Sequence, residues 1–215
     1  MPFLAWSNMF LDGEYVDGFP PFLVRYQHIL FLPLLCIARI SWVVQSIITV
    51  ATSPDVPDSR TRMIEAGTLA LHYAYYGAIA YFLLDSWHSI LLFVFLSQAV
   101  AGLALGTVFV INHNSMEILD SDAVTHTNFV AMQIRTTRNI TPSLAGDWFS
   151  GGLSYQIEHH LFPSLPRHRF SQVVPRVRAL AEKHGLQYQS IGYFSGLVDV
   201  LRHLKEIASS TEKDL

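Results

Sequence analysis

Cysteine and charge are both scarce in this chain. Cys36 is the one cysteine among 215 residues and lies within an apolar run, which excludes a disulfide framework and a zinc site built from thiolates. Charged residues make up 14% of the sequence and the formal net charge is -3, so we expect no basic surface of the kind that binds nucleic acid. Hydrophobic residues make up 51%, a share that points towards the membrane protein classes.

Two long apolar runs follow one another closely and are candidates for membrane helices. Residues 66–84 and 88–112 each approach or exceed the roughly 20 residues that a helix needs to cross the hydrocarbon core. Only residues 85–87 separate them, which predicts a transmembrane hairpin over 66–112 that returns to the side from which it entered. A buried hairpin of a soluble bundle is the alternative, because polar residues such as His72 interrupt the runs.

A third apolar segment covers residues 27–50 and is less regular. Arg39 would lie near the bilayer centre, at a cost of about 3 kcal/mol. Pro33 also interrupts the segment, because proline lacks the backbone N–H that a helix requires. The segment is therefore predicted either as a helix lying partly in the membrane interface or as a tilted membrane helix whose Arg39 faces protein.

The distribution of lysine and arginine orients the predicted hairpin. The loop 51–65 contains two arginines, the turn at 85–87 contains no basic residue, and the region from His113 onward contains several. Because basic residues flank membrane helices mainly on the cytosolic side, both the loop and the C-terminal region are predicted to be cytosolic. The chain is thus expected to be an all-α integral membrane protein, with a transmembrane hairpin and a cytosolic helical cap formed by residues 113–215.

Two further apolar stripes predict the helices of this cap. One runs at helical spacing from Val173 to a stop at Gly185, and the other covers 191–204. The glycine pair at 151–152 is expected to let the chain bend.

The segment YQIEHHLFP, residues 155–163, predicts a metal-binding helix face. Gln156, His159 and His160 stand at positions i, i+3 and i+4, so they project from one side of a helix, which Pro163 should end. An ordinary surface or core role is the alternative, as it is for most histidines. The inverted zinc-protease signature H-x-x-E-H does not apply, because tyrosine holds the position of its first histidine.

His113 lies where the second helix of the hairpin should emerge on the cytosolic side. From there we expect it to face the same cavity as the histidine pair, although a polar residue marking the helix end is the alternative reading. If the helix continues, Glu117 lies four residues later and is expected to hold the imidazole of His113 by a hydrogen bond.

Three stretches of the sequence resemble a known family. DWFSGGLSYQIEHHLFPSLPRHRF, residues 147–170, resembles the third histidine box of the membrane fatty acid desaturases, and more narrowly the front-end branch, in which glutamine replaces the first histidine of H-x-x-H-H. YQHILFLPLL, residues 26–35, and NHNSMEI, residues 112–118, resemble stretches between the second and third boxes of that branch. The resemblance covers essentially the whole chain.

This resemblance implies a non-haem di-iron centre that activates O2 and inserts a double bond into a fatty acyl chain of a lipid. It also implies cytochrome b5, or a fused b5 domain, as electron donor, and a multi-pass protein of the endoplasmic reticulum membrane whose histidine box faces the cytosol. His113, Gln156, His159 and His160 are the candidate iron ligands. Imidazole suits iron, whereas Gln156, which would bind through its carbonyl oxygen or position a water, is the weakest of the four.

The chain also departs from the family. Members carry two earlier boxes, H-D-x-x-H and H-x-x-H-H, but His28, His72 and His88 are isolated here, and no H-P-G-G haem motif is present. Residues 1–215 are therefore predicted to be the C-terminal part of a desaturase domain.

Four candidate ligands leave most of the roughly ten coordination positions of two irons unfilled, so we expect no activity from the chain alone. One alternative is a non-catalytic membrane subunit or regulator that pairs with a full-length desaturase in a homodimer or heterodimer. Another is a lipid hydroxylase of the same superfamily.

Overall fold

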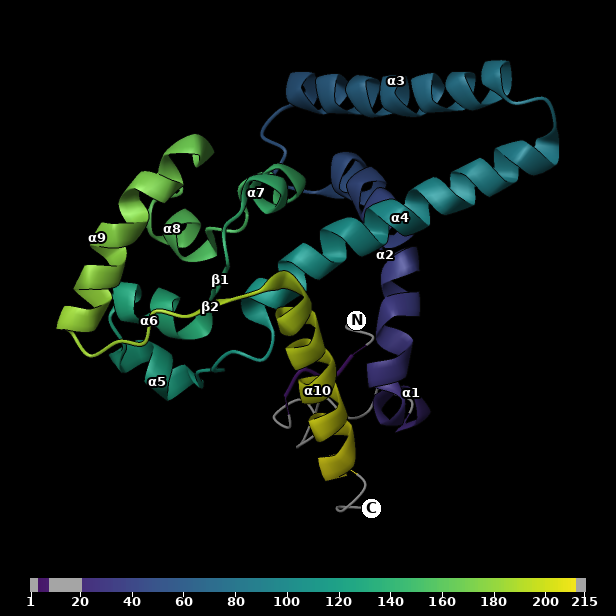
Figure 1. The fold of residues 1–215 in the computed structure, drawn as a ribbon. Helices are drawn as coiled ribbons and strands as arrows, with labels where there is room; N and C mark the ends of the chain where they lie inside the picture. Colours follow the sequence, from purple (N-terminus) through teal and green to yellow (C-terminus); the bar gives the residue numbers. More distant parts are fainter. Residues whose placement is uncertain (1–3, 8–20, 212–215) are drawn as a thin grey trace. The chain divides into compact units, whose positions relative to one another are not determined.

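The computed structural model describes residues 4–7 and 21–211, and helices dominate it (Figure 1). The helices are α1 (Pro21–Arg25), α2 (Gln27–Thr52), α3 (Ser59–Leu83), α4 (Trp87–His113), α5 (Ser121–His126), α6 (Phe129–Thr136), α7 (Leu144–Ser150), α8 (Gln156–Leu161), α9 (Phe170–Lys183) and α10 (Tyr193–Thr211), with one 3-10 turn at Arg167–Arg169. The all-α class is thus confirmed. A two-residue parallel pairing, β1 (Asn139–Ile140) with β2 (Ser190–Ile191), was not expected, because two residues are too few to give a sequence pattern.

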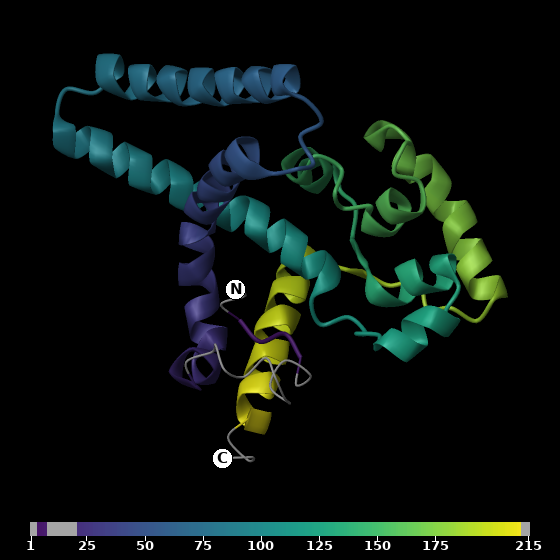
Figure 2. The ribbon, with the colours of Figure 1, turned by 180° about the vertical axis from the view of Figure 1, so that it is seen from behind.

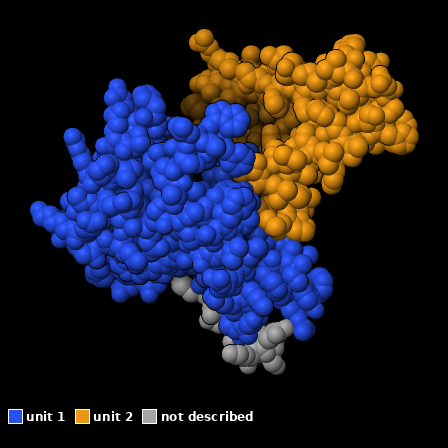
Figure 3. Space-filling view, viewed as in Figure 1, with its two compact units in different colours: residues 1–31, 105–215 blue, residues 32–104 orange. Residues whose placement is uncertain are grey.

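Contacts divide the chain into two compact units (Figure 3). One unit contains residues 32–104, and the other combines residues 1–31 with 105–215. The long helices α2 and α4 each begin in one unit and end in the other.

Two helices of the described chain, α2 and α4, are long and apolar enough to cross a membrane. The boundaries of α4 agree with the apolar run 88–112, whereas α3 begins at Ser59, before the run 66–84. Helix α3 also carries four tyrosines and a histidine and does not reach the same hydropathy. The helix α2 continues through Pro33, contrary to the expected interruption, because a proline in its second turn removes only one backbone donor.

Within residues 32–104, the helices pack closely where small or aromatic residues face one another. A Cβ atom on Gly102 of α4 would lie 2.2 Å from the Leu35 carbonyl oxygen of α2, so only glycine allows this approach. Tyr76 of α3 stacks on Phe93 of α4 with ring centroids 5.5 Å apart and forms a hydrogen bond with Ser97. These contacts join α4 to α2 at Gly102 and to α3 at Tyr76.

The other unit has an apolar core built by α6, α8 and α9, which lie together in two opposite views (Figures 1 and 2). Ile134, Ile157, Val177 and Ala181 form its buried cluster. Both predicted cap helices are present as α9 and α10, and Gly185 follows the end of α9 with a φ of +67°, as a helix stop requires.

The helix α10 packs on the last turns of α4. Val108 and Ile111 of α4 form a second buried cluster with Ile140, and Leu197 of α10 packs against it. A Cβ atom on Gly196 would lie 2.6 Å from a methyl group of Ile111, so this glycine sets how closely the two helices approach. The end of α4 that carries His113 is therefore fixed within this unit.

Candidate metal centre

The short helix α8 carries the sequence motif and ends where it was expected to end. It begins at Gln156 and ends at Leu161, and the chain leaves the helical conformation just before Pro163. Gly151 and Gly152 have φ values of +60° and +85°, which turn the chain between α7 and α8 in a conformation that favours glycine. The bend and the helix end are both confirmed.

Three of the four candidate ligands converge. The Nε2 atoms of His113 and His160 lie 3.1 and 2.8 Å from the side-chain nitrogen of Gln156, and the two imidazole rings are 5.1 Å apart. An amide nitrogen offers only hydrogens, so each imidazole turns a lone pair towards it. Two nitrogen lone pairs thus meet at one point, as the ligation of a cation requires.

His160 is held in the state that a metal ligand needs. Its Nδ1 lies 2.6 Å from the Gln133 side-chain oxygen, to which it donates, so Nε2 carries the free lone pair. Burial lowers the pKa of His160, and the neighbouring His159 lowers it further. The neutral imidazole is therefore favoured at neutral pH.

Gln156 is itself oriented by Asn112, the residue before His113. The Asn112 amide nitrogen lies 3.3 Å from the Gln156 side-chain oxygen and also donates to the Leu153 carbonyl at 2.9 Å. The end of α4 thus supplies one candidate ligand and the residue that orients another. This role of Asn112 was not predicted from the sequence. Its position next to His113, at the end of an apolar run, could have indicated it.

His159 lies outside this convergence. Its ring packs edge-on against Phe170 at 6.1 Å between centroids, and it is 5.8 Å from the ring of His160. Over residues 4–7 and 21–211, no three His, Cys, Asp or Glu side chains come together in a way that could hold a metal ion. The structure therefore assembles two imidazoles and one amide.

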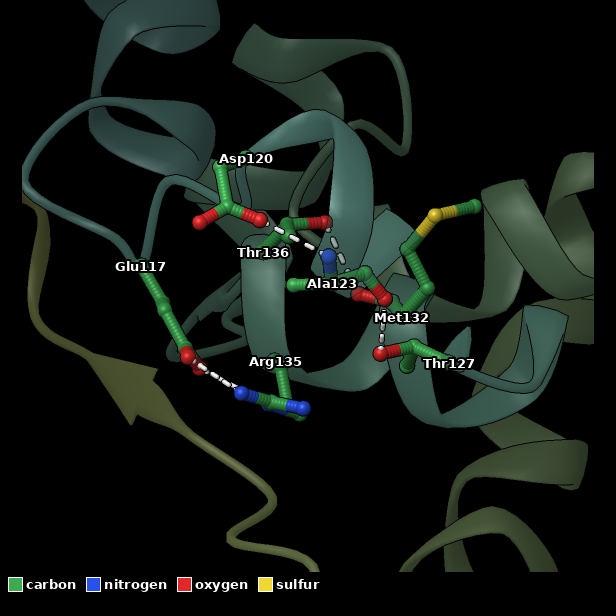
Figure 4. Close-up of polar contacts among 7 residues, drawn as sticks. All are labelled: Glu117, Asp120, Ala123, Thr127, Met132, Arg135 and Thr136. Atoms are coloured by element: carbon green, nitrogen blue, oxygen red, sulfur yellow. Dashed lines mark hydrogen bonds and ion pairs between the residues drawn. The ribbon is translucent and has the colours of Figure 1, made fainter. Parts of the chain in front are cut away.

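The expected role of Glu117 is wrong. Helix α4 ends at His113 and the chain turns at Ser115, where φ is +63°, so the four-residue helical spacing does not extend to Glu117. Glu117 instead binds Arg135, whose Nε donates at 2.8 Å and whose Nη2 makes a second contact (Figure 4). These hydrogen bonds lower the pKa of the Glu117 carboxyl.

A buried polar network lies on the far side of α8 from the candidate ligands. Glu158 is fully buried and accepts hydrogen bonds from Asn139 at 2.7 Å and from the Tyr188 hydroxyl at 2.8 Å. The Asn139 side-chain oxygen in turn accepts from the Ile157 backbone N–H at 2.9 Å. Burial and the Glu158 carboxylate raise the pKa of Tyr188. Asn139 in β1 thus fixes the position of α8.

Arg138, the residue before Asn139, fixes the end of α4 in the same way. Its side chain is 4% exposed, and its Nε donates to the Ile111 carbonyl at 2.7 Å. The other guanidinium nitrogens donate to Asp199 of α10 at 2.6 Å and to Ser115 at 3.0 Å. Two consecutive residues therefore position the two elements that carry the candidate ligands. Neither was singled out from the sequence, because their partners are distant along the chain.

Comparison with known proteins identifies one family. The profile of the family described as fatty acid desaturase matches residues 6–192. The chain is 39% identical over 210 residues to the acyl-lipid (9-3)-desaturase of Physcomitrium patens, which covers 98% of this chain and 38% of the relative. No solved structure matches the chain.

Two further relatives are similar at 35% identity. They are the Delta(5) fatty acid desaturase fat-4 of Caenorhabditis elegans, over 100% of this chain and 49% of the relative, and the Delta(8)-fatty-acid desaturase of Euglena gracilis, over 99% and 51%. The chain spans about half or less of the length of these relatives.

Proposed function

The chain belongs to the fatty acid desaturase family, and we propose from this that it is the C-terminal, iron-binding part of a front-end acyl-lipid desaturase. The reaction is the O2-dependent insertion of a double bond into a fatty acyl chain, with electrons from cytochrome b5 or a fused b5 domain. The observation that carries the proposal is the convergence of the His113 and His160 lone pairs on Gln156.

The donor set is compatible with iron. Two imidazole nitrogens and an amide can bind iron as they can other first-row metals, and membership of the desaturase family favours iron. When bound, a di-iron centre supplies the activation of O2 and the oxidation of the acyl chain. His113 and His160 would each provide a nitrogen ligand. Because the Gln156 oxygen accepts from Asn112 and its nitrogen faces the imidazoles, Gln156 would ligate through its oxygen only after its amide turns, and would otherwise keep a water in place.

His159 is proposed to serve the other iron. Successive residues on an α-helix point about 100° apart, so His159 and His160 diverge. Their rings are tilted by 79° with centroids 5.8 Å apart, which suits ligands of two separate ions. The remaining coordination positions are filled by residues outside this chain, and for that reason the chain alone is proposed to be inactive.

Expression in yeast tests this function. The 215-residue chain with cytochrome b5 should give no new unsaturated fatty acid, because too few ligands are present. The same chain joined to the portion of the Physcomitrium patens relative that it does not cover should give one, detected by gas chromatography of total lipids. The matched control is the joined protein with His160→Ala, which should give no product.

The other possible results of this experiment would favour the alternative functions. Product from the chain alone would contradict the ligand count, and hydroxylated lipid from the joined protein would identify a hydroxylase. A joined protein that binds iron normally and yields no product would favour a non-catalytic subunit.

We also propose that α3 and α4 cross the endoplasmic reticulum membrane as a hairpin and that residues 113–215 lie in the cytosol. The basis is the pair Arg60 and Arg62 in the first turn of α3 and the lack of basic residues between α3 and α4. Protease added to sealed microsomes should remove an epitope at the C-terminus. A lumenal marker must stay intact until detergent is added, and protection of the epitope in such sealed microsomes would reverse the orientation.

A further inference from the structure

A group of large apolar side chains stands exposed on α7 and the first turn of α10. Leu144 is 95% exposed, Trp148 85%, Phe194 78% and Phe149 50%. Together with Tyr193 they form what is here called the aromatic surface. Single exposed apolar residues are ordinary, but a contiguous set of this size marks a surface that another phase or molecule covers.

The aromatic surface is continuous across its two helices. The rings of Phe149 in α7 and Tyr193 in α10 meet edge to face at 6.2 Å, and Tyr193 and Phe194 are 5.4 Å apart. A groove of about 420 Å³ lies between the helices, and Val108 of α4 is part of its lining.

This surface is attached to the last turns of α4. The Tyr193 hydroxyl lies 2.6 Å from the Thr107 hydroxyl, and Val108 is 3% exposed. Helix α4 has 27 residues and is therefore about 40 Å long, about 10 Å more than the hydrocarbon core. If the excess is shared between its ends, Thr107 lies close to the boundary between acyl chains and headgroups.

The chemistry of the surface fits that boundary. Trp and Tyr concentrate at membrane interfaces, where the ring is apolar and the polar atom reaches water. Asp147 is the one charged residue of α7, and its carboxylate accepts a hydrogen bond from Tyr155 at 3.0 Å, within the protein. The aromatic surface itself contains no charge, so it suits a lipid interface and not a charged protein partner.

We propose that the aromatic surface inserts into the cytosolic interface of the bilayer and holds the metal centre at a fixed depth. Helix α8 follows α7 directly through the glycine turn, so the depth of Trp148 sets the depth of Gln156 and His160. This inference rests on the proposed membrane crossing of α4, and the test treats the two separately.

Single spin labels in phosphatidylcholine vesicles test the inference on the full chain. In a Cys36→Ser background, cysteine replaces Leu144, Trp148, Phe95 or Glu182, and each protein carries one nitroxide. Phe95, in the middle of α4 and 60% exposed, reports the membrane crossing, and Glu182 on the exposed face of α9 reports water. Collision rates are measured with O2, which concentrates in lipid, and with a water-soluble nickel chelate.

Labels at 144 and 148 should show an oxygen-to-nickel collision ratio severalfold above that at 182 and below that at 95, because O2 is more concentrated in the hydrocarbon core than at the interface. A ratio at 144 and 148 equal to that at 182, with 95 still in lipid, would overturn the inference alone. Shielding of 144 and 148 from both reagents would also overturn it, because protein would then cover the surface. A water-like ratio at 95 would refute the proposed crossing of α4 and the inference with it.

Discussion

In the joined protein, His160→Ala is expected to abolish both iron binding at this position and desaturase activity. The side chain contributes one of the two imidazole nitrogens that converge on Gln156, and no neighbouring nitrogen could replace it. Replacement of Gln133 by leucine should weaken iron binding by about 10–100-fold, because the hydrogen bond that keeps the proton on His160 Nδ1 is lost. Iron per purified protein is measured by mass spectrometry.

His126→Ala is the matched control for this prediction. The His126 side chain is 77% exposed and lies 3.7 Å from the exposed Asp122 carboxylate, so the variant should keep full iron content and activity. Full iron occupancy in His160→Ala would exclude this side of α8 as a metal site.

Removal of Asn139 is expected to destabilise the core formed by α6, α8 and α9 by about 1–3 kcal/mol, because it leaves the buried Glu158 carboxylate without its amide donor. The Ile157 backbone N–H loses its acceptor in the same change. Asn139→Ala should therefore lower the thermal midpoint of helix unfolding in detergent, followed by circular dichroism. Thr141→Ala, which removes an exposed and longer hydrogen bond to Ser190, should change it little.

A double-mutant cycle identifies the cause. In a Glu158→Gln background the buried charge is gone, so Asn139→Ala should cost much less than in the native chain. Equal costs in both backgrounds would show that the hydrogen bond to Ile157 or packing, and not the Glu158 charge, accounts for the effect of Asn139.

Local patterns predicted the helices well and the polar contacts poorly. The end of α8, the glycine turn before it and the two cap helices all depend on neighbouring residues, so spacing and turn chemistry suffice to find them. Glu158 is bound by Asn139 and Tyr188, which lie 19 and 30 residues away, and no periodicity indicates such partners. Glu117 was misassigned for a related reason, because helical spacing was extended past the end of α4.

The metal ligands themselves stay a prediction. Sequence spacing placed Gln156 and His160 on one side of α8, and the structure adds the close approach of His113 from α4. It gives His159 a different neighbour, Phe170, which the linear motif did not indicate.

Arg138 holds the end of α4 and Asn139 holds α8. This arrangement determines which loop of the chain can change in length. The distance in space between His113 and Gln156 is set by these two adjacent anchors and not by the number of residues between the ligands. The exposed stretch that includes α5 lies outside both anchors, so insertions and deletions there leave the ligand spacing intact. We therefore expect a change in the length of this loop to leave iron binding intact, provided that Arg138 and Asn139 are both present.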